Sequence, residues 1–235
     1  MKRALLLFAA ATVASVGCAN NDVSLSIIQM EAVTTTTNCV ATATAGAGAI
    51  GRDRGLLDVS LVTTSGYIAV PVVRNNLVSF NNGVEYNAIQ LSGANVKLTQ
   101  VGGEALVLPS GQSSFFYAAA AGRLDPGGTA AMFVEVLPAP AAKSLAGMIP
   151  SGGLYTVMAQ VRPVGDRQND QVIGGSINFP IDLCSGCLVQ TSTCPLPKGT
   201  MAVDPCFPQQ DDPSICCTDP TTNVTSCGPA APVAM

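Results

Sequence analysis

The sequence predicts an all-β protein with a disulfide-rich, loop-rich C-terminal segment. Three observations support this prediction. Short apolar stretches that alternate with polar residues recur through residues 23–183, turns rich in glycine separate them, and seven of the 9 cysteines fall within residues 184–227. An alternation with a period of two is typical of half-buried strands, whereas an amphipathic helix repeats every 3.6 residues.

Six stretches carry the alternation most clearly. They are residues 23–27, 57–61, 68–72, 132–136, 155–161 and 177–183. In the last stretch all the apolar residues share one face, and in residues 57–61 we expect Asp58 and Ser60 to face solvent. Glycine-containing turn sequences occur at residues 81–83, 102–103, 126–128 and 151–153. These turns bound the predicted strands.

Two prolines and one short segment modify this pattern. Pro71 and Pro180 lie inside strand-like runs. Because proline has no backbone N–H to donate to a neighbouring strand, we expect an edge strand or a bulge at each of them. Residues 138–148 can hold one short turn of helix. We count about eight or nine strands. Their natural packing is an immunoglobulin-like antiparallel β-sandwich, which we place at residues 23–183.

The composition excludes several function classes. The chain has no His and therefore no Ser-His-Asp or Cys-His triad and no His-ligated zinc. A formal charge of −4 without a basic stripe argues against nucleic-acid binding. Only four Glu and no Trp are available for a carboxylate-based glycosidase, and no Gly-x-Ser-x-Gly elbow occurs. We therefore expect no enzyme, no cofactor and no metal site.

The N-terminus has the features of an export signal. Lys2 and Arg3 precede an apolar run at residues 4–14, and Ser15-Val-Gly-Cys18 follows. The run is too short for a membrane-spanning helix, which needs about 20 residues, and a basic head before a short apolar core is typical of a secretory signal. The ending resembles the lipobox of bacterial lipoproteins, and it departs from that pattern at Ser15, where Leu is commonest.

This resemblance implies a membrane anchor. In the family, the chain is cut before the cysteine, the Cys18 sulfur would carry diacylglycerol, and the freed amine is commonly acylated, for example with palmitate. Residues 1–17 would then be the signal peptide and residues 18–22 the lipidated end and a short tether. Ala19 rather than Asp follows Cys18, so the resemblance implies an outer-membrane lipoprotein. An ordinary signal peptidase that cuts nearby is the alternative.

The remaining cysteines are even in number, which in an exported chain indicates disulfides. They are Cys39, Cys184, Cys187, Cys194, Cys206, Cys216, Cys217 and Cys227. Seven of them lie in residues 184–227 and cannot all pair with one another. If all are oxidised, Cys39 must therefore bond to that segment. Cys216 and Cys217 are adjacent, and we expect each to bond to a different partner.

The C-terminal segment differs from the domain before it. Residues 184–227 are rich in Cys, Pro, Thr and Asp, and six prolines interrupt residues 195–220. We expect a loop-rich knot without regular elements, fixed by disulfides and clamped to the sandwich through Cys39. We expect residues 228–235 to form a frayed tail.

Four local patterns each allow a specific functional interpretation beside a structural one. Gly46-Ala-Gly48-Ala-Ile-Gly51 matches a dinucleotide fingerprint, but a predicted strand follows it instead of a helix, so we interpret it as a loop. Cys184-Ser-Gly-Cys187 resembles a redox dithiol, yet a structural disulfide suits its setting better. Zinc bound by the thiolates of Cys184, Cys187, Cys216 and Cys217 is a third alternative. The acidic residues of 166–170 and Asp211-Asp212 offer calcium ligands without the spacing of a calcium loop, and a polar turn and a solvated loop explain them.

Two function classes remain. The first is a non-catalytic structural or binding module, held at a bacterial membrane by its lipid anchor, with an envelope or surface protein as a possible partner. The second is a binding protein for a small apolar ligand, lipid or peptide, which would need an accessible apolar pocket or an exposed edge strand. An enzyme that uses carboxylates is a third function class, which the composition supports least.

Overall fold

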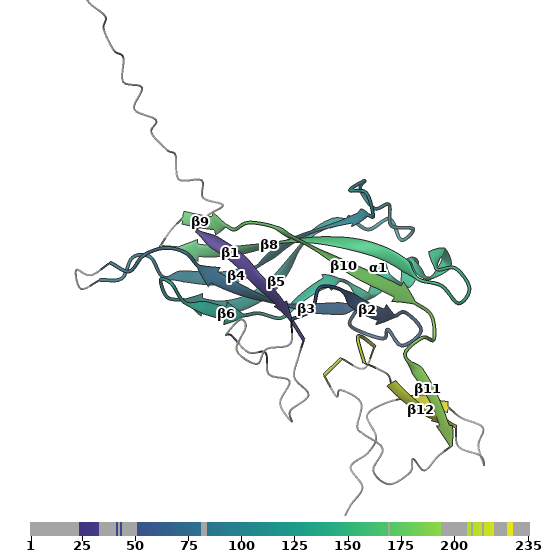
Figure 1. Cartoon of the computed structure of the whole chain (residues 1–235). Helices are drawn as coiled ribbons and strands as arrows, with labels where there is room; N and C mark the ends of the chain where they lie inside the picture. The colour runs from purple at the N-terminus through teal and green to yellow at the C-terminus, as the bar shows by residue number, and fades with distance from the viewer. Residues whose placement is uncertain are drawn as a thin grey trace, which may run out of the picture.

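The computed structural model describes most of the expected sandwich and parts of the C-terminal segment (Figure 1). The described residues are 24–32, 41, 43, 51–80, 84–168, 170–193, 206–207, 209–212, 214–218 and 225–227. The expected signal peptide, Cys18, Cys39, Cys194, the Gly46–Gly48 loop and the tail at 228–235 lie outside them. Among the described residues, no helix is both long and apolar enough to cross a membrane.

One sheet has four strands. Its order is β1-β3-β6, and β7 also pairs with β3. The strands are β1 (Leu25–Glu31), β3 (Tyr67–Asn75), β6 (Thr129–Ala131) and β7 (Val134–Leu137). All of these pairs are antiparallel. The central strand β3 is apolar at almost every position, and every residue in it except Arg74 is buried or half-buried.

The second sheet has six strands. Its order is β2-β10-β8-β4-β5, and β9 also pairs with β8. The strands are β2 (Gly55–Asp58), β4 (Ile89–Gln100), β5 (Phe115–Leu124), β8 (Tyr155–Arg167), β9 (Asp170–Ile173) and β10 (Ile177–Cys184). The β2–β10 pair is parallel, and the others are antiparallel. The chain therefore changes sheets between β1 and β2.

This topology confirms the predicted immunoglobulin-like sandwich. In that fold the first, second and fifth strands share one sheet, and the third, sixth and seventh strands share the other. The order β1-β3-β6 fits the first sheet, and β4, β8 and β10 fit the second, extended by β5 at one edge and β2 at the other. The inward side chains of both sheets form one core, with Leu25, Leu57, Tyr67, Leu98 and Ile181 almost fully buried.

The predicted short helix is present at the end of the sandwich. Helix α1 (Ala139–Ser144) and a 3-10 turn at Ala146–Met148 follow β7. Proline at the start of α1 suits the first helical turn, where a missing N–H costs nothing. Ala141, Ala142 and Leu145 are buried and join this segment to the core.

Two details of the prediction need correction, and a third is confirmed. The strand expected at 57–61 ends at Asp58, which is buried instead of facing solvent, because its carboxylate accepts hydrogen bonds from the N–H and Oγ of Ser60 and turns the chain. Pro71 lies in a central strand and not at an edge. It falls where the pairing of β3 passes from β7 to β6. At Pro180 the prediction of an edge is confirmed, because this residue directly precedes the stretch of β10 that pairs with β2 and that side of β10 is open there.

The C-terminal segment also differs from the prediction. It contains a three-stranded sheet made of β11 (Val189–Thr193), β12 (Ser214–Thr218) and β13 (Thr225–Cys227). The expectation that prolines would prevent regular elements is therefore wrong for these stretches, none of which contains proline. The register places Cys216 of β12 opposite Cys227 of β13.

Candidate functional site

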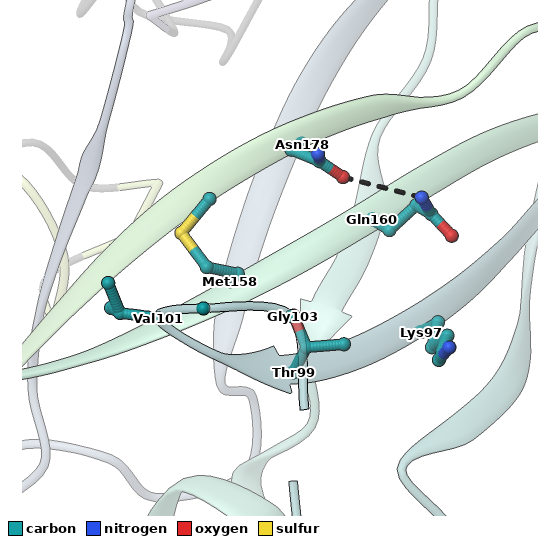
Figure 2. Close-up of a pocket in the computed structure, with 8 residues that line it drawn as sticks. Lys97, Thr99, Val101, Gly103, Met158, Gln160 and Asn178 are labelled. Atoms are coloured by element: carbon teal, nitrogen blue, oxygen red, sulfur yellow. Dashed lines mark hydrogen bonds between the residues drawn. The ribbon is translucent and has the colours of Figure 1, made fainter. Parts of the chain in front are cut away.

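The outer face of the second sheet carries an open groove of about 400 Å³ (Figure 2). Strands β4, β8 and β10 form its floor, and the hairpin that follows β4 forms one wall. The lining residues are Lys97, Thr99, Val101, Gly102, Gly103, Met158, Gln160 and Asn178. We call this hollow the outer groove.

The pleat of the sheet explains why these residues meet. Lys97 lies opposite Gln160, and Gln160 lies opposite Asn178, so three strands present their side chains at one level. Because side chains alternate across a strand, Leu98 between Lys97 and Thr99 points into the core and is fully buried. The groove is thus built on a rigid, packed sheet.

The wall of the groove is a tight hairpin after β4. The Gly103 N–H donates to the Gln100 carbonyl (3.0 Å), and the Gln100 N–H donates to the Glu104 carbonyl (2.8 Å). Gly102 and Gly103 have φ values of 118° and 91°, which favour glycine. This turn leaves the Val101 side chain 68% exposed at the rim of the groove.

A second hollow of about 170 Å³ continues the groove across β4 toward β5. It shares Lys97 and Gln160 with the outer groove, so the two hollows are contiguous. The additional lining residues are Asn95, Phe115, Arg162 and Ile173. Phe115 is 59% exposed. A large aromatic ring at this exposure beside two cations is a feature of recognition surfaces.

The charges of the two hollows have one sign. Lys97 and Arg162 are exposed, and neither has an ion-pair partner among the described residues. No Asp or Glu of the described residues lines either hollow. The other polar groups are amides and one hydroxyl, and the Gln160 Nε2 group donates a long hydrogen bond of 3.4 Å to Asn178 Oδ1 (Figure 2). The face therefore offers donors and positive charge to a ligand.

A second feature lies at the β2 edge of the sandwich, where residues 209–211 of the C-terminal segment dock. The Asp58 N–H donates to the Gln209 carbonyl (2.9 Å), and the Asp211 N–H donates to the Leu56 carbonyl (2.8 Å). Gln210 forms an antiparallel bridge with Leu57. The segment thus covers an otherwise open edge, which is the usual protection against edge-to-edge association.

The side chains of this docked segment reach the other sheet. The Gln210 amide accepts from the Ile68 N–H (2.8 Å) and donates to the Ile68 carbonyl (2.9 Å). The Gln209 amide donates to the Gly66 carbonyl (3.0 Å) and to Ser65 Oγ (3.1 Å). Both glutamines are buried. The segment therefore joins the edge strand β2 of one sheet to the start of the central strand β3 of the other.

Asp211 completes the docking, and the expectation of a solvated loop at Asp211 is wrong. Its carboxylate accepts hydrogen bonds from the Tyr67 hydroxyl (2.9 Å) and the Leu56 N–H (2.9 Å), and it lies 3.5 Å from the Arg52 guanidinium. Burial raises the pKa of Asp211, and burial together with the neighbouring Asp211 carboxylate raises the pKa of Tyr67. The donors around Asp211 come from the protein itself, so this carboxylate is a docking group.

The Cys184-Ser-Gly-Cys187 pair forms a disulfide, as predicted. Asp58 fixes its loop: the carboxylate accepts from the Gly186 N–H (2.8 Å) and the Leu188 N–H (2.9 Å). One Asp58 oxygen and both sulfurs lie within 4.8 Å of one another. Because the sulfurs are bonded to each other, they do not supply the thiolates that zinc requires. The arrangement is that of a structural clamp.

The other predicted site residues are only partly described. Cys206 is disulfide-bonded, and Cys216, Cys217 and Cys227 lie in β12 and β13. Cys18, Cys39 and Cys194 lie outside the described residues. Sequence reasoning missed the outer groove because it did not identify β4, which supplies Lys97 and Thr99.

Comparison with known proteins adds little to this picture. No family model matches the chain, and no curated protein matches it. A solved structure described as "Crystal structure of protein from Archaeoglobus fulgidus" is similar over 55% of this chain and 90% of its own, with 13% identity and a TM-score of 0.28. A likeness this weak carries no argument about function.

Proposed function

We propose that the chain is a lipid-anchored, extracytoplasmic and non-catalytic binding module that recognises its partner on the outer face of the second sheet. The observation that carries the proposal is the continuous hollow formed by the outer groove and its extension toward β5. Its two cations, which have no ion-pair partner in the described part of the chain, its exposed aromatic ring and its amides are groups that bind a partner.

The proposed anchor at Cys18 is compatible with an accessible groove. The first strand begins at Leu25, and Leu25 lies beside Gly174 and Pro163 near the C-terminal end of β8. Met158, at the groove, precedes Pro163 by five residues on β8, which is roughly 17 Å along the strand. A lipidated Cys18 would therefore attach the sandwich close to the Arg162 end of the binding surface, and the Met158 end of the groove would lie further from the attachment point.

The lining supports a role in binding and not in catalysis. Around both hollows the side chains are Lys, Arg, Asn, Gln, Thr, Met, Val, Ile and Phe. General acid–base chemistry needs a group that titrates near the working pH, and covalent catalysis needs a nucleophile beside a base. Neither constellation lines these hollows.

Site-specific photo-cross-linking in membranes tests the proposal. A photoreactive residue replaces Gln160 at the centre of the groove in the full-length protein, and a second variant carries it at Arg74, which is exposed on the other sheet. We expect a discrete cross-linked adduct from position 160 and none from position 74. Equal adducts from both positions, or none from position 160, would contradict the proposal.

A further inference from the structure

We infer that the occupant of the outer groove is an extended acidic segment of a protein partner, in which an apolar residue adjoins the acidic residues. This inference rests on the proposed function and specifies the ligand of the same site. In the bound state, the carboxylates of the segment pair with Lys97 and Arg162, and its apolar side chain packs between Val101 and Met158.

The two cations are on adjacent strands, and no described residue forms an ion pair with either of them. Lys97 lies opposite Gln160, and Arg162 lies opposite Asn95, so Lys97 and Arg162 are diagonal neighbours on adjacent strands. The backbones of such neighbours are roughly 7–8 Å apart, so both long side chains can reach the carboxylates of one ligand. The Arg162 guanidinium can hold one carboxylate through two parallel hydrogen bonds. In a chain of net charge −4, this local positive charge favours an anionic ligand.

The shape of the site favours an extended ligand. The contiguous hollows draw lining residues from β10, β8, β4 and β5, which are consecutive in the sheet. Neighbouring strands are about 4.8 Å apart, so the site spans about 14 Å, which is the length of about four extended residues. The amides of Gln160 and Asn178 offer both donors and acceptors, which suits a peptide backbone.

The end of the groove at the hairpin favours a peptide over an acidic polysaccharide. Val101 and Met158 present aliphatic surface there, and Figure 2 shows Met158 lying between the hairpin and β10. Methionine adapts to side chains of different shapes because it is unbranched and polarizable. Within the part of the chain that the structure describes, no carboxylate, a strong acceptor for the hydroxyls of a sugar, lines either hollow.

Fluorescence anisotropy with defined probes tests this inference on the full-length protein in detergent. The probes are a fluorescein-labelled hexapeptide of alternating Glu and Leu, the corresponding Lys-Leu hexapeptide, and unlabelled polygalacturonate as a competitor. We expect the Glu-Leu peptide to bind, the Lys-Leu peptide not to bind, and binding to weaken as salt is added.

Matched variants assign the binding to the groove. Lys97→Gln with Arg162→Gln removes both cations without adding a charge, and Arg74→Gln makes the same change on the other sheet. We expect the double variant to weaken binding of the Glu-Leu peptide by roughly tenfold or more and Arg74→Gln to leave it unchanged. Equal circular dichroism spectra and melting temperatures show that the variants are folded.

The outcomes separate this inference from the proposed function. Equal binding of the two peptides, or binding that the double variant does not weaken, overturns the acidic-peptide ligand. If polygalacturonate binds through Lys97 and Arg162 and the Glu-Leu peptide does not bind, the ligand is an acidic polysaccharide, and the acidic-peptide inference is overturned. If position 160 still forms its adduct in either case, the binding role of the groove stands. Loss of that adduct would instead contradict the proposed function.

Discussion

The Tyr67 hydroxyl donates a hydrogen bond of 2.9 Å to the Asp211 carboxylate, which lies 144 residues further along the chain. Tyr67 begins the central strand of one sheet, and Asp211 belongs to the segment that covers the edge of the other. This contact therefore ties the C-terminal segment to both sheets. It shows that the segment is part of the domain and not an appended tail.

Tyr67→Phe is expected to lower the free energy of unfolding by about 1–3 kcal/mol, because it leaves a buried carboxylate with one fewer donor. Urea denaturation measures the change. The control is Tyr117→Phe, because Tyr117 is 49% exposed on β5. Removing its hydroxyl should change the free energy of unfolding by less than about 0.5 kcal/mol. Equal effects of the two substitutions would show that the Tyr67–Asp211 contact does not stabilise the domain.

The docked segment is expected to stabilise the domain more at acid pH than at neutral pH. Burial raises the pKa of the folded Asp211 above its ordinary value of 3.8, so the folded chain binds a proton that the unfolded chain releases. This contribution to stability is full below pH 3.8 and is lost as the pH rises through the raised pKa.

Comparison with Asp211→Asn, which does not titrate at this position, isolates the effect. We measure the free energy of unfolding of both proteins by urea denaturation from pH 4 to pH 8. The stability of the wild type relative to the variant should fall as the pH rises. A difference that stays constant or rises with pH would show that the folded pKa is not raised.

Cys18→Ala is expected to abolish membrane anchoring, because the thioether to the lipid can no longer form. Detergent-phase partitioning of the full-length protein from cells measures this directly: wild type should enter the detergent phase, and the variant should remain uncleaved or enter the aqueous phase. Cys39→Ser is the control and should partition like wild type. If wild type and Cys18→Ala partition alike, Cys18 carries no lipid.

Cys39→Ser is expected to release one thiol in the C-terminal segment. With Cys184 bonded to Cys187, five cysteines of that segment remain, an odd number, so one of them must bond to Cys39 if all are oxidised. Thiol alkylation and peptide mapping of the denatured protein should find one free thiol in the mature variant and none in the wild type. Stability should fall by about 2–5 kcal/mol. Alkylation of Cys39 in the wild type without prior reduction would exclude this bridge.

The strands that sequence reasoning found and those that it missed differ in a physical way. Residues 177–183 alternate large apolar and other side chains without interruption, and β10 follows them closely. In β4 the register shifts between Leu91 and Gly93, so the apolar residues change phase within the strand and the alternation breaks. In β5 four consecutive alanines take alternately half-buried and exposed positions, so the sequence itself shows no alternation there.

The polar contacts could not be predicted from local sequence. Gln209 and Gln210 are polar residues in a loop, which indicates exposure, yet both are buried. Their side-chain amides are satisfied by the backbone of Gly66, just before β3, and of Ile68 in β3. Asp58 likewise receives two N–H groups from residues about 130 positions away. Buried polar residues of this kind depend on partners that only the complete fold brings together.

The central claim is that Lys97 and Arg162 on the outer face of the second sheet recognise the partner. Co-purification from detergent-solubilised membranes tests it most directly, with wild type compared with Lys97→Glu/Arg162→Glu and with Arg74→Glu as the matched control. Quantitative mass spectrometry should find a partner that is recovered in equal amounts with wild type and with Arg74→Glu. The amount recovered with the double variant should be lower by roughly tenfold or more. Equal recovery of every co-purifying protein by all three would contradict the claim.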